Sequence, residues 1–266
     1  MRRCLANYTL RIFFSADCLA SSVDFDTIQK PGWVATSLAE RPMPGVELTP
    51  PARLTPTDLA TVHDPTYVRA VQCGAPRHLA DSSGLAWNAG LWTSVRASNG
   101  GAVAAARLAL RSDTNAGSLS CGLHHARRDH GAGFCTFNGL ALAARAAIDE
   151  GATRVVVLDL DAHCGGGTAS LVSAWAEVTH VDASKKSVAY ARENDSVVLE
   201  LAAPLAGIQP LDFDAARKGP LFGVTYKYLN GEWQAHVASL SSALTVPENR
   251  RLSTPSSKVG IIKSML

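Results

Sequence analysis

Hydrophobic residues along the chain follow the spacings of regular secondary structure. Apolar side chains recur at helical spacing over residues 97–111 and 138–150, and Gly151 is placed to end the second helix. The segment 154–158 is a nearly continuous apolar run, which is typical of a strand buried on both faces of a parallel sheet. A further strand is expected at 178–181. This alternation predicts an α/β fold with an open, mainly parallel sheet flanked by helices.

The ends of the chain and its proline-rich part are less regular. Residues 9–14 are expected to form the first strand, and the prolines of residues 31–65 favour loops and short helices over one long element. Thr168 is placed to cap a helix that follows three glycines. We expect a single domain over residues 1–246 and a weakly ordered tail over 247–266.

Composition narrows the functional classes. The chain has 266 residues, of which 47% are hydrophobic and 18% charged, and this excludes global disorder and a coiled coil. A net charge of +2 without a dense basic run argues against nucleic-acid binding. No stretch approaches the roughly 18 apolar residues of a membrane span. Six cysteines without a C-x-x-C pair suggest no disulfide framework, so we expect a cytoplasmic protein.

The segment Asp159-Leu160-Asp161-Ala162-His163 carries the strongest chemical signal. Side chains alternate along an extended backbone, so Asp159, Asp161 and His163 are expected on one side, at the carboxyl end of a buried strand. Two carboxylates and an imidazole form a ready set of ligands for a divalent metal. The alternative is a strand end with ordinary capping aspartates and a solvated histidine.

A pair of adjacent histidines, His124 and His125, follows a short predicted strand at 117–121. In a loop both rings can face one cavity, where a neutral imidazole acts as a general base near pH 7. Two surface or core histidines are the plainer alternative. Downstream, Gly133 allows close approach of the backbone to a ligand, and Phe134 offers a flat apolar wall.

Three blocks together resemble the histone deacetylase superfamily, including the bacterial acetylpolyamine amidohydrolases. The blocks are L-H-H-A (123–126), G-F-C-T-F-N-G (133–139) and V-V-V-L-D-L-D-A-H-C-G-G-G-T (155–168). Their order and spacing match the family, and a looser resemblance extends over residues 9–184.

The resemblance implies roles for the central residues. His124 corresponds to the general base, and His125 to a second histidine that acts as an electrostatic or acid partner. Asp159 corresponds to the carboxylate that orients the first histidine and touches a structural potassium ion. Asp161 and His163 correspond to two zinc ligands.

The resemblance is weaker towards the C-terminus. Gly133 and Phe134 correspond to the wall of the acyl-lysine channel, and Asp214 is the candidate for the third zinc ligand. Gly166 stands where the family has an Asp or Asn that supports the second histidine. The tyrosine-bearing G-G-Y segment, which polarises the substrate carbonyl in the family, is not found. The fold is therefore expected to be incomplete after about residue 185.

We interpret the sequence as that of a zinc-dependent hydrolase of small acyl amides or esters. Without the tyrosine, the hydrolysis of amides is expected to slow more than that of esters, because esters have better leaving groups. Arginase relatives share D-x-D-A-H but require an aspartate where Gly165 stands. A degenerate deacetylase-like protein that binds acylated ligands or a partner is the second alternative.

Overall fold

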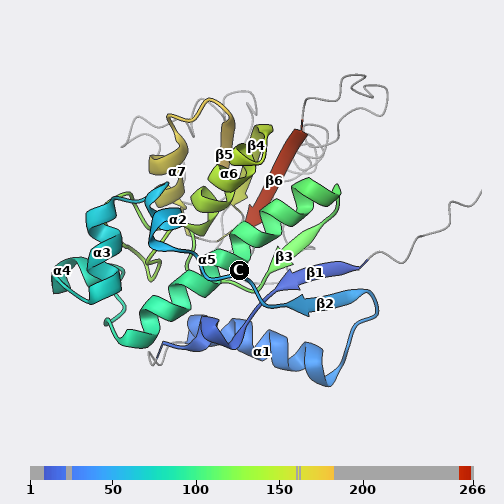
Figure 1. The fold of residues 1–266 in the computed structure, drawn as a ribbon, viewed down its shortest axis with the longest axis horizontal. Coiled ribbons are helices and arrows are strands. Elements are labelled where there is room, and N and C mark those ends of the chain that lie inside the picture. Colours follow the sequence, from blue (N-terminus) through green and yellow to red (C-terminus); the bar gives the residue numbers. More distant parts are fainter. Residues whose placement is uncertain (1–8, 22–25, 160, 162, 183–257, 265–266) are drawn as a thin grey trace, which may run out of the picture.

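The computed structural model describes residues 9–21, 26–159, 161, 163–182 and 258–264 (Figure 1). The strands in these ranges are β1 (Leu10–Phe13), β2 (Val46–Thr49), β3 (Ala116–Ser118), β4 (Ala152–Asp159), β5 (Val178–Asp182) and β6 (Lys258–Ser264). The helices are the 3-10 helix η1 (Ala16–Leu19), α1 (Asp26–Glu40), α2 (Pro56–Ala60), α3 (Pro65–Cys73), α4 (Arg77–Ala80), α5 (Ala89–Ser112), α6 (Gly139–Asp149) and α7 (Gly166–Val172).

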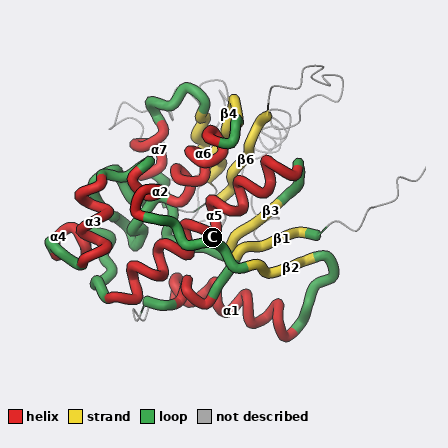
Figure 2. Tube along the Cα trace, viewed as in Figure 1, coloured by secondary structure: helices red, strands yellow, loops and turns green. Residues whose placement is uncertain are grey.

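Every pairing between these strands is parallel. β1 lies between β2 and β3, with Leu10 opposite Val46. β4 lies between β5 and β6, with Val155 opposite Val178. Helices flank both groups of strands (Figure 2), so the predicted parallel α/β architecture is confirmed.

The long helix α5 connects the two groups of strands through its packing. It contacts β1 and β3 on one side and α6 on the other, and α6 in turn packs against β4 (Figure 1). Val155 and Val157 of β4 are almost fully buried, at 1% and 0% exposure. The apolar run at 154–158 is thus a strand in the core, as its composition predicts, and it carries Asp159 at its carboxyl end.

Three local expectations were wrong. α1 is 15 residues long and continues through Pro31, whose burial together with Ile28 and Ala35 offsets the hydrogen bond that proline cannot make. Thr168 lies inside α7 rather than at its N-cap, which is Gly165. Residues 258–264, placed by sequence in a weakly ordered tail, pair with β4 as β6.

Among the described helices, none combines the length and the apolar character that crossing a bilayer requires.

Candidate functional site

The site begins at the carboxyl end of β4, where Asp159 is fully buried. One carboxylate oxygen, Oδ1, accepts a hydrogen bond from the backbone N–H of Asp161 at 3.1 Å. The other, Oδ2, lies 2.8 Å from Nδ1 of His124. Asp159 therefore joins the end of the strand to the loop that carries the two histidines.

His124 and Asp159 form a buried pair. An ionised carboxylate only accepts hydrogen bonds, so Nδ1 of His124 carries the hydrogen and Nε2 keeps a free lone pair. Burial lowers the pKa of His124, but the hydrogen bond and charge of Asp159, helped by Asp161 and Asp182, outweigh it, so the net pKa is raised. The ring is thus held in the orientation and tautomer that a general base needs.

His125 lies beside His124, with ring centroids 4.0 Å apart. Burial, together with the neighbouring rings of His124 and His163, lowers the pKa of His125 to about 4. Its ring fits because Gly133 has no side chain: a Cβ there would lie 2.4 Å from Cδ2 of His125. Gly133 also has a positive φ of 51°, which glycine adopts without strain.

Asp161 and His163 lie next to each other on the same side of the site. Oδ1 of Asp161 accepts a hydrogen bond from the backbone N–H of His163 at 2.7 Å and lies 2.9 Å from its Nδ1. The same oxygen is 3.9 Å from Nε2 of His124. The predicted base and the two predicted metal ligands thus converge on one point.

A pocket of about 460 Å³ opens at this point. The residues that line it come from α1, from the histidine loop and from the segments around Phe134 and Asp161. They are Thr27, Ile28, Lys30, Cys121, Gly122, His124, His125, Gly133, Phe134, Cys135, Asp161 and His163. Of the residues predicted from sequence, the structure brings seven together: six in this lining, and Asp159 directly behind His124. Asp214 lies outside the described residues.

A second group of potential metal ligands lies behind the first. Donor atoms of Asp159, His180 and Asp182 all lie within 4.8 Å of one another. His180 is 3% exposed, and neither of its ring nitrogens has a hydrogen-bond partner among the described residues. Burial lowers the pKa of His180 and favours the neutral ring that can bind a metal. His180 and Asp182 were not singled out by the sequence, because they belong to an ordinary-looking strand.

The backbone of the histidine loop is held by Asn138, which is fully buried. Its Nδ2 donates to the carbonyl oxygens of His124 at 3.2 Å and Ala126 at 3.1 Å. Thr168 of α7 adds a backbone N–H bond of 3.0 Å to the same His124 oxygen. Sequence reasoning assigned both residues to helix starts only. Their positions in the blocks 133–139 and 155–168, which resemble the family, were the available signal.

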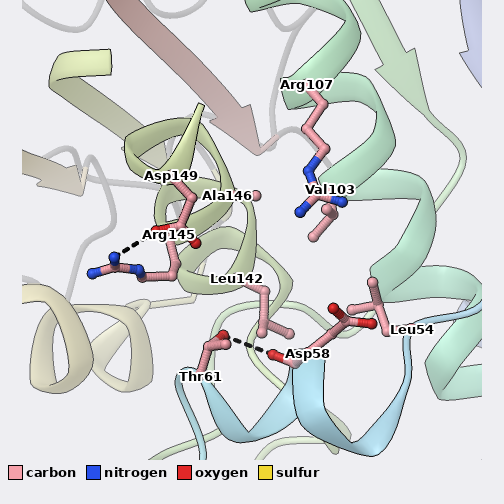
Figure 3. Close-up of a pocket in the computed structure, with 9 residues that line it drawn as sticks. All are labelled: Leu54, Asp58, Thr61, Val103, Arg107, Leu142, Arg145, Ala146 and Asp149. Carbon is pink, nitrogen blue, oxygen red and sulfur yellow. Dashed lines mark hydrogen bonds and ion pairs between the residues drawn. The ribbon is translucent and has the colours of Figure 1, made fainter. Parts of the chain in front are cut away.

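A smaller pocket of about 60 Å³ lies between α2, α5 and α6 (Figure 3). Its lining residues are Leu54, Asp58, Thr61, Val103, Arg107, Leu142, Arg145, Ala146 and Asp149. The charged side chains of this pocket contact neighbouring residues. Arg145 pairs with Asp149, Arg107 pairs with Glu150, and Asp58 caps α2 through Thr55. The candidate site residues among the described residues line the larger pocket or, for Asp159, lie directly behind it.

A buried His–Asp pair beside a second carboxylate and imidazole suits metal-assisted hydrolysis, because one imidazole can accept a proton from water while the other two groups can hold a metal. Comparison with known families makes the assignment specific. Residues 28–192, more than half of the chain, match the histone deacetylase domain. The chain therefore belongs to the histone deacetylase domain family, as the three sequence blocks indicated.

Several curated proteins are similar to parts of the chain. An uncharacterised protein of Picosynechococcus sp. is 40% identical over 117 residues, which is 42% of this chain and 37% of the relative. The acetylpolyamine amidohydrolase of Burkholderia pseudomallei is 37% identical over 126 residues, 45% of this chain and 35% of the relative. The acetoin utilization protein AcuC of Bacillus subtilis is 30% identical over 131 residues, 46% of this chain and 34% of the relative. The chain spans about a third of the length of these relatives.

Among solved structures, the crystal structure of the HDA15 HD domain has the same fold. The TM-score is 0.56 at 23% identity, and the match covers 66% of this chain and 53% of that chain. The similarity supports the α/β architecture of the described residues.

Proposed function

We propose that the protein is a metal-dependent, deacetylase-like hydrolase that cleaves small acyl amides or esters. The observation that carries the proposal is the buried 2.8 Å contact between His124 and Asp159, with the free Nε2 facing the pocket that Asp161 and His163 line. Membership of the histone deacetylase domain family and similarity to a protein named acetylpolyamine amidohydrolase support the same reaction class.

We propose zinc as the metal, held by Asp161 and His163 with Asp214 as the third ligand. Two ligands of one tetrahedral Zn²⁺, each at about 2.0–2.1 Å, lie roughly 3.3 Å apart. Oδ1 of Asp161 and Nδ1 of His163 are 2.9 Å apart, a hydrogen-bond distance, so the two atoms would separate slightly and His163 would give up that hydrogen to hold one ion. When bound, zinc would polarise the acyl carbonyl and offset the negative charge that develops on its oxygen.

In this proposal the protein residues carry the proton transfers. His124 accepts a proton at Nε2 from the water that attacks the acyl carbon, and Asp159 stabilises the imidazolium that forms. The same proton can then pass to the leaving amine or alcohol. His125, with its pKa lowered to about 4, stays neutral at pH 7 and serves as a hydrogen-bonding neighbour.

Esters are the proposed preferred substrates. Tyr67, the tyrosine that the described residues contain, donates its hydroxyl to the carbonyl oxygen of Thr136 at 2.6 Å and is buried away from the pocket. It therefore does not polarise a substrate carbonyl. Esters need less stabilisation of the oxyanion than amides because their leaving groups are better. Their hydrolysis therefore depends less on a tyrosine that polarises the carbonyl.

We further propose that Asp159, His180 and Asp182 hold a structural cation, for which potassium is the expectation from the family resemblance. The two carboxylates supply oxygen ligands, and the buried His180, whose ring nitrogens have no hydrogen-bond partner among the described residues, can supply a third donor. Such an ion would fix the distance between the ends of β4 and β5.

The test combines metal analysis with turnover of a chromogenic acetate ester. We expect zinc to copurify with the protein and a chelator to abolish turnover. His163→Ala should lose most of the metal, whereas His124→Ala should keep it and lose about two to four orders of magnitude in turnover. His78→Ala, a change to an exposed histidine on α4, is the matched control. Full turnover by metal-loaded His124→Ala would refute the proposed role of that residue.

A binding protein without turnover is the second candidate. Gly166 favours it, because this position gives His125 no side-chain support. In that case the wild type would bind zinc and an acylated ligand but would hydrolyse neither the ester nor an acetyl-lysine peptide.

A further inference from the structure

The wall of the large pocket includes one strongly basic side chain, Lys30 of α1. Thr27, Ile28 and Lys30 follow one another along the first two turns of the helix and all line the pocket. Ile28 is buried and anchors the helix, whereas Lys30 is exposed. Lys30 is also the single lysine or arginine among the described lining residues.

The charge of Lys30 is not neutralised by its described neighbours. Asp161 is the carboxylate among the lining residues, and it is engaged by His163. Asp26 precedes Lys30 by one helical turn but does not line the pocket, and within the described part of the chain no ion pair involves Lys30. Among the described residues, the ammonium group of Lys30 thus has no carboxylate partner, and it lines the pocket that a ligand would enter.

Lys30 and Cys121 line the same pocket, so the charge of one bears on the thiol of the other. Burial raises the pKa of the Cys121 thiol to about 12, and the ammonium of Lys30 acts in the opposite direction. The charge is thus felt inside the pocket as well as in the surrounding solvent.

We propose that Lys30 is a specificity-determining residue that selects acyl substrates with a carboxylate on the leaving part and disfavours those with a distal ammonium group. The inference rests on the proposed hydrolase function and adds a substrate class to it. A charge at the rim discriminates between ligands by attracting one sign and repelling the other. Small N-acyl amino acids fit this requirement, and acylated diamines do not.

A matched pair of ligands tests the proposal. N-acetyl-6-aminohexanoate and N-acetyl-1,6-diaminohexane share the acyl group and the chain length but carry opposite charges. Both are measured as competitive inhibitors of ester hydrolysis by the wild type. The anion should bind about 3- to 5-fold more tightly than the cation, which is the scale of exposed charge pairs. In Lys30→Glu the cation should bind more tightly than the anion. The ratio of their two inhibition constants should therefore change by about 10- to 30-fold relative to the wild type. Lys30→Gln should abolish the preference.

Arg41→Glu is the control, because it makes the same change in net charge just beyond the other end of α1, on an exposed residue outside the pocket. Its ratio should stay within about twofold of the wild type. An unchanged ratio in Lys30→Glu overturns the inference and leaves the hydrolase proposal intact.

If the wild type hydrolyses no ester, the proposed function fails separately. The same two ligands are then compared by calorimetric titration. An anion preference that Lys30→Glu reverses supports the role of Lys30, and equal affinities refute it.

Discussion

At the scale of single residues, Gly165 leaves the space in which His124 and Asp159 meet. A Cβ at this position would lie 2.3 Å from Oδ2 of Asp159 and 3.3 Å from Nδ1 of His124. The backbone of Gly165 has a φ of −75°, which other residues also adopt. The requirement for glycine here is therefore steric, and it concerns the two atoms that make the 2.8 Å contact.

We expect Gly165→Ala to reduce ester turnover by about two orders of magnitude, the lower end of the range for loss of an acid–base group. The added methyl group pushes the Asp159 carboxylate away from His124, which loses its orientation. Gly117→Ala is the control, since its Cβ would meet Ile12 at an ordinary 3.7 Å. Steady-state kinetics measure the effect. Wild-type turnover in a folded Gly165→Ala protein would show that the pair is not needed.

His125 is expected to matter less than His124. Its pKa is lowered to about 4, and Gly166 supplies no side chain to hold its ring. We predict that His125→Ala lowers ester turnover by no more than about tenfold, against the two to four orders of magnitude expected for His124→Ala. Kinetics of both variants at equal metal content test this order. A larger loss in His125→Ala would assign the proton transfer to that residue.

At the scale of secondary-structure elements, Asn138 connects α6 to the histidine loop. Its Oδ1 accepts from the backbone N–H of Ala141 and so caps α6, while its Nδ2 donates to the carbonyl oxygens of His124 and Ala126. One buried side chain thus performs two tasks. An aspartate at this position would keep the cap but lose the two donors.

Asn138→Asp should therefore destabilise the protein by on the order of 3 kcal/mol, because a buried carboxylate would face two carbonyl oxygens without a donor. Asn88→Asp is the matched control: Asn88 caps α5 through Leu91 in the same way, but it is only half-buried. In Asn88→Asp we expect the free energy of unfolding to change by no more than about 1 kcal/mol. Urea denaturation gives both values. Similar losses in the two variants would show that capping alone explains the role of Asn138.

Elements with a strong periodic pattern could be predicted from sequence, and those that depend on tertiary contacts could not. The apolar run of β4 and the helical spacing of α6 locate both elements correctly. The helix through Pro31 was missed because its stability comes from burial of one face. Thr168 resembles a cap by residue type, yet its partners are His124 and Asn138, which are distant in the chain.

The same distinction applies to the candidate site. Asp159, Asp161 and His163 are close in sequence, so their convergence could be anticipated from one strand end. Lys30 and His180 could not be anticipated. They reach the site from α1 and β5, and only the packing of these elements brings their side chains there.

At the scale of the whole molecule, His63 lies at the centre of the contacts that join α2, α3 and the loop before α6. It is fully buried and packs against Phe137, with ring centroids 5.1 Å apart. Nε2 accepts a hydrogen bond from the backbone N–H of Asn138 at 2.9 Å, so Nδ1 carries the hydrogen that is donated to the carbonyl oxygen of Arg127 at 2.8 Å. A proton on Nε2 would face the N–H of Asn138.

Burial accordingly lowers the pKa of His63 from 6.5 to about 4. Between these values the unfolded chain binds a proton that the folded protein does not, so stability falls as the pH decreases from 6.5 to 4. We expect this residue to cost about 2 kcal/mol of unfolding free energy on going from pH 7 to pH 5. In His63→Gln, which cannot be protonated, the loss over the same interval should be smaller by that amount. His78→Gln, at an exposed position on α4, should retain the full wild-type dependence. Urea denaturation at the two pH values measures the difference, and parallel curves for the wild type and His63→Gln would show that His63 is not held neutral in the fold.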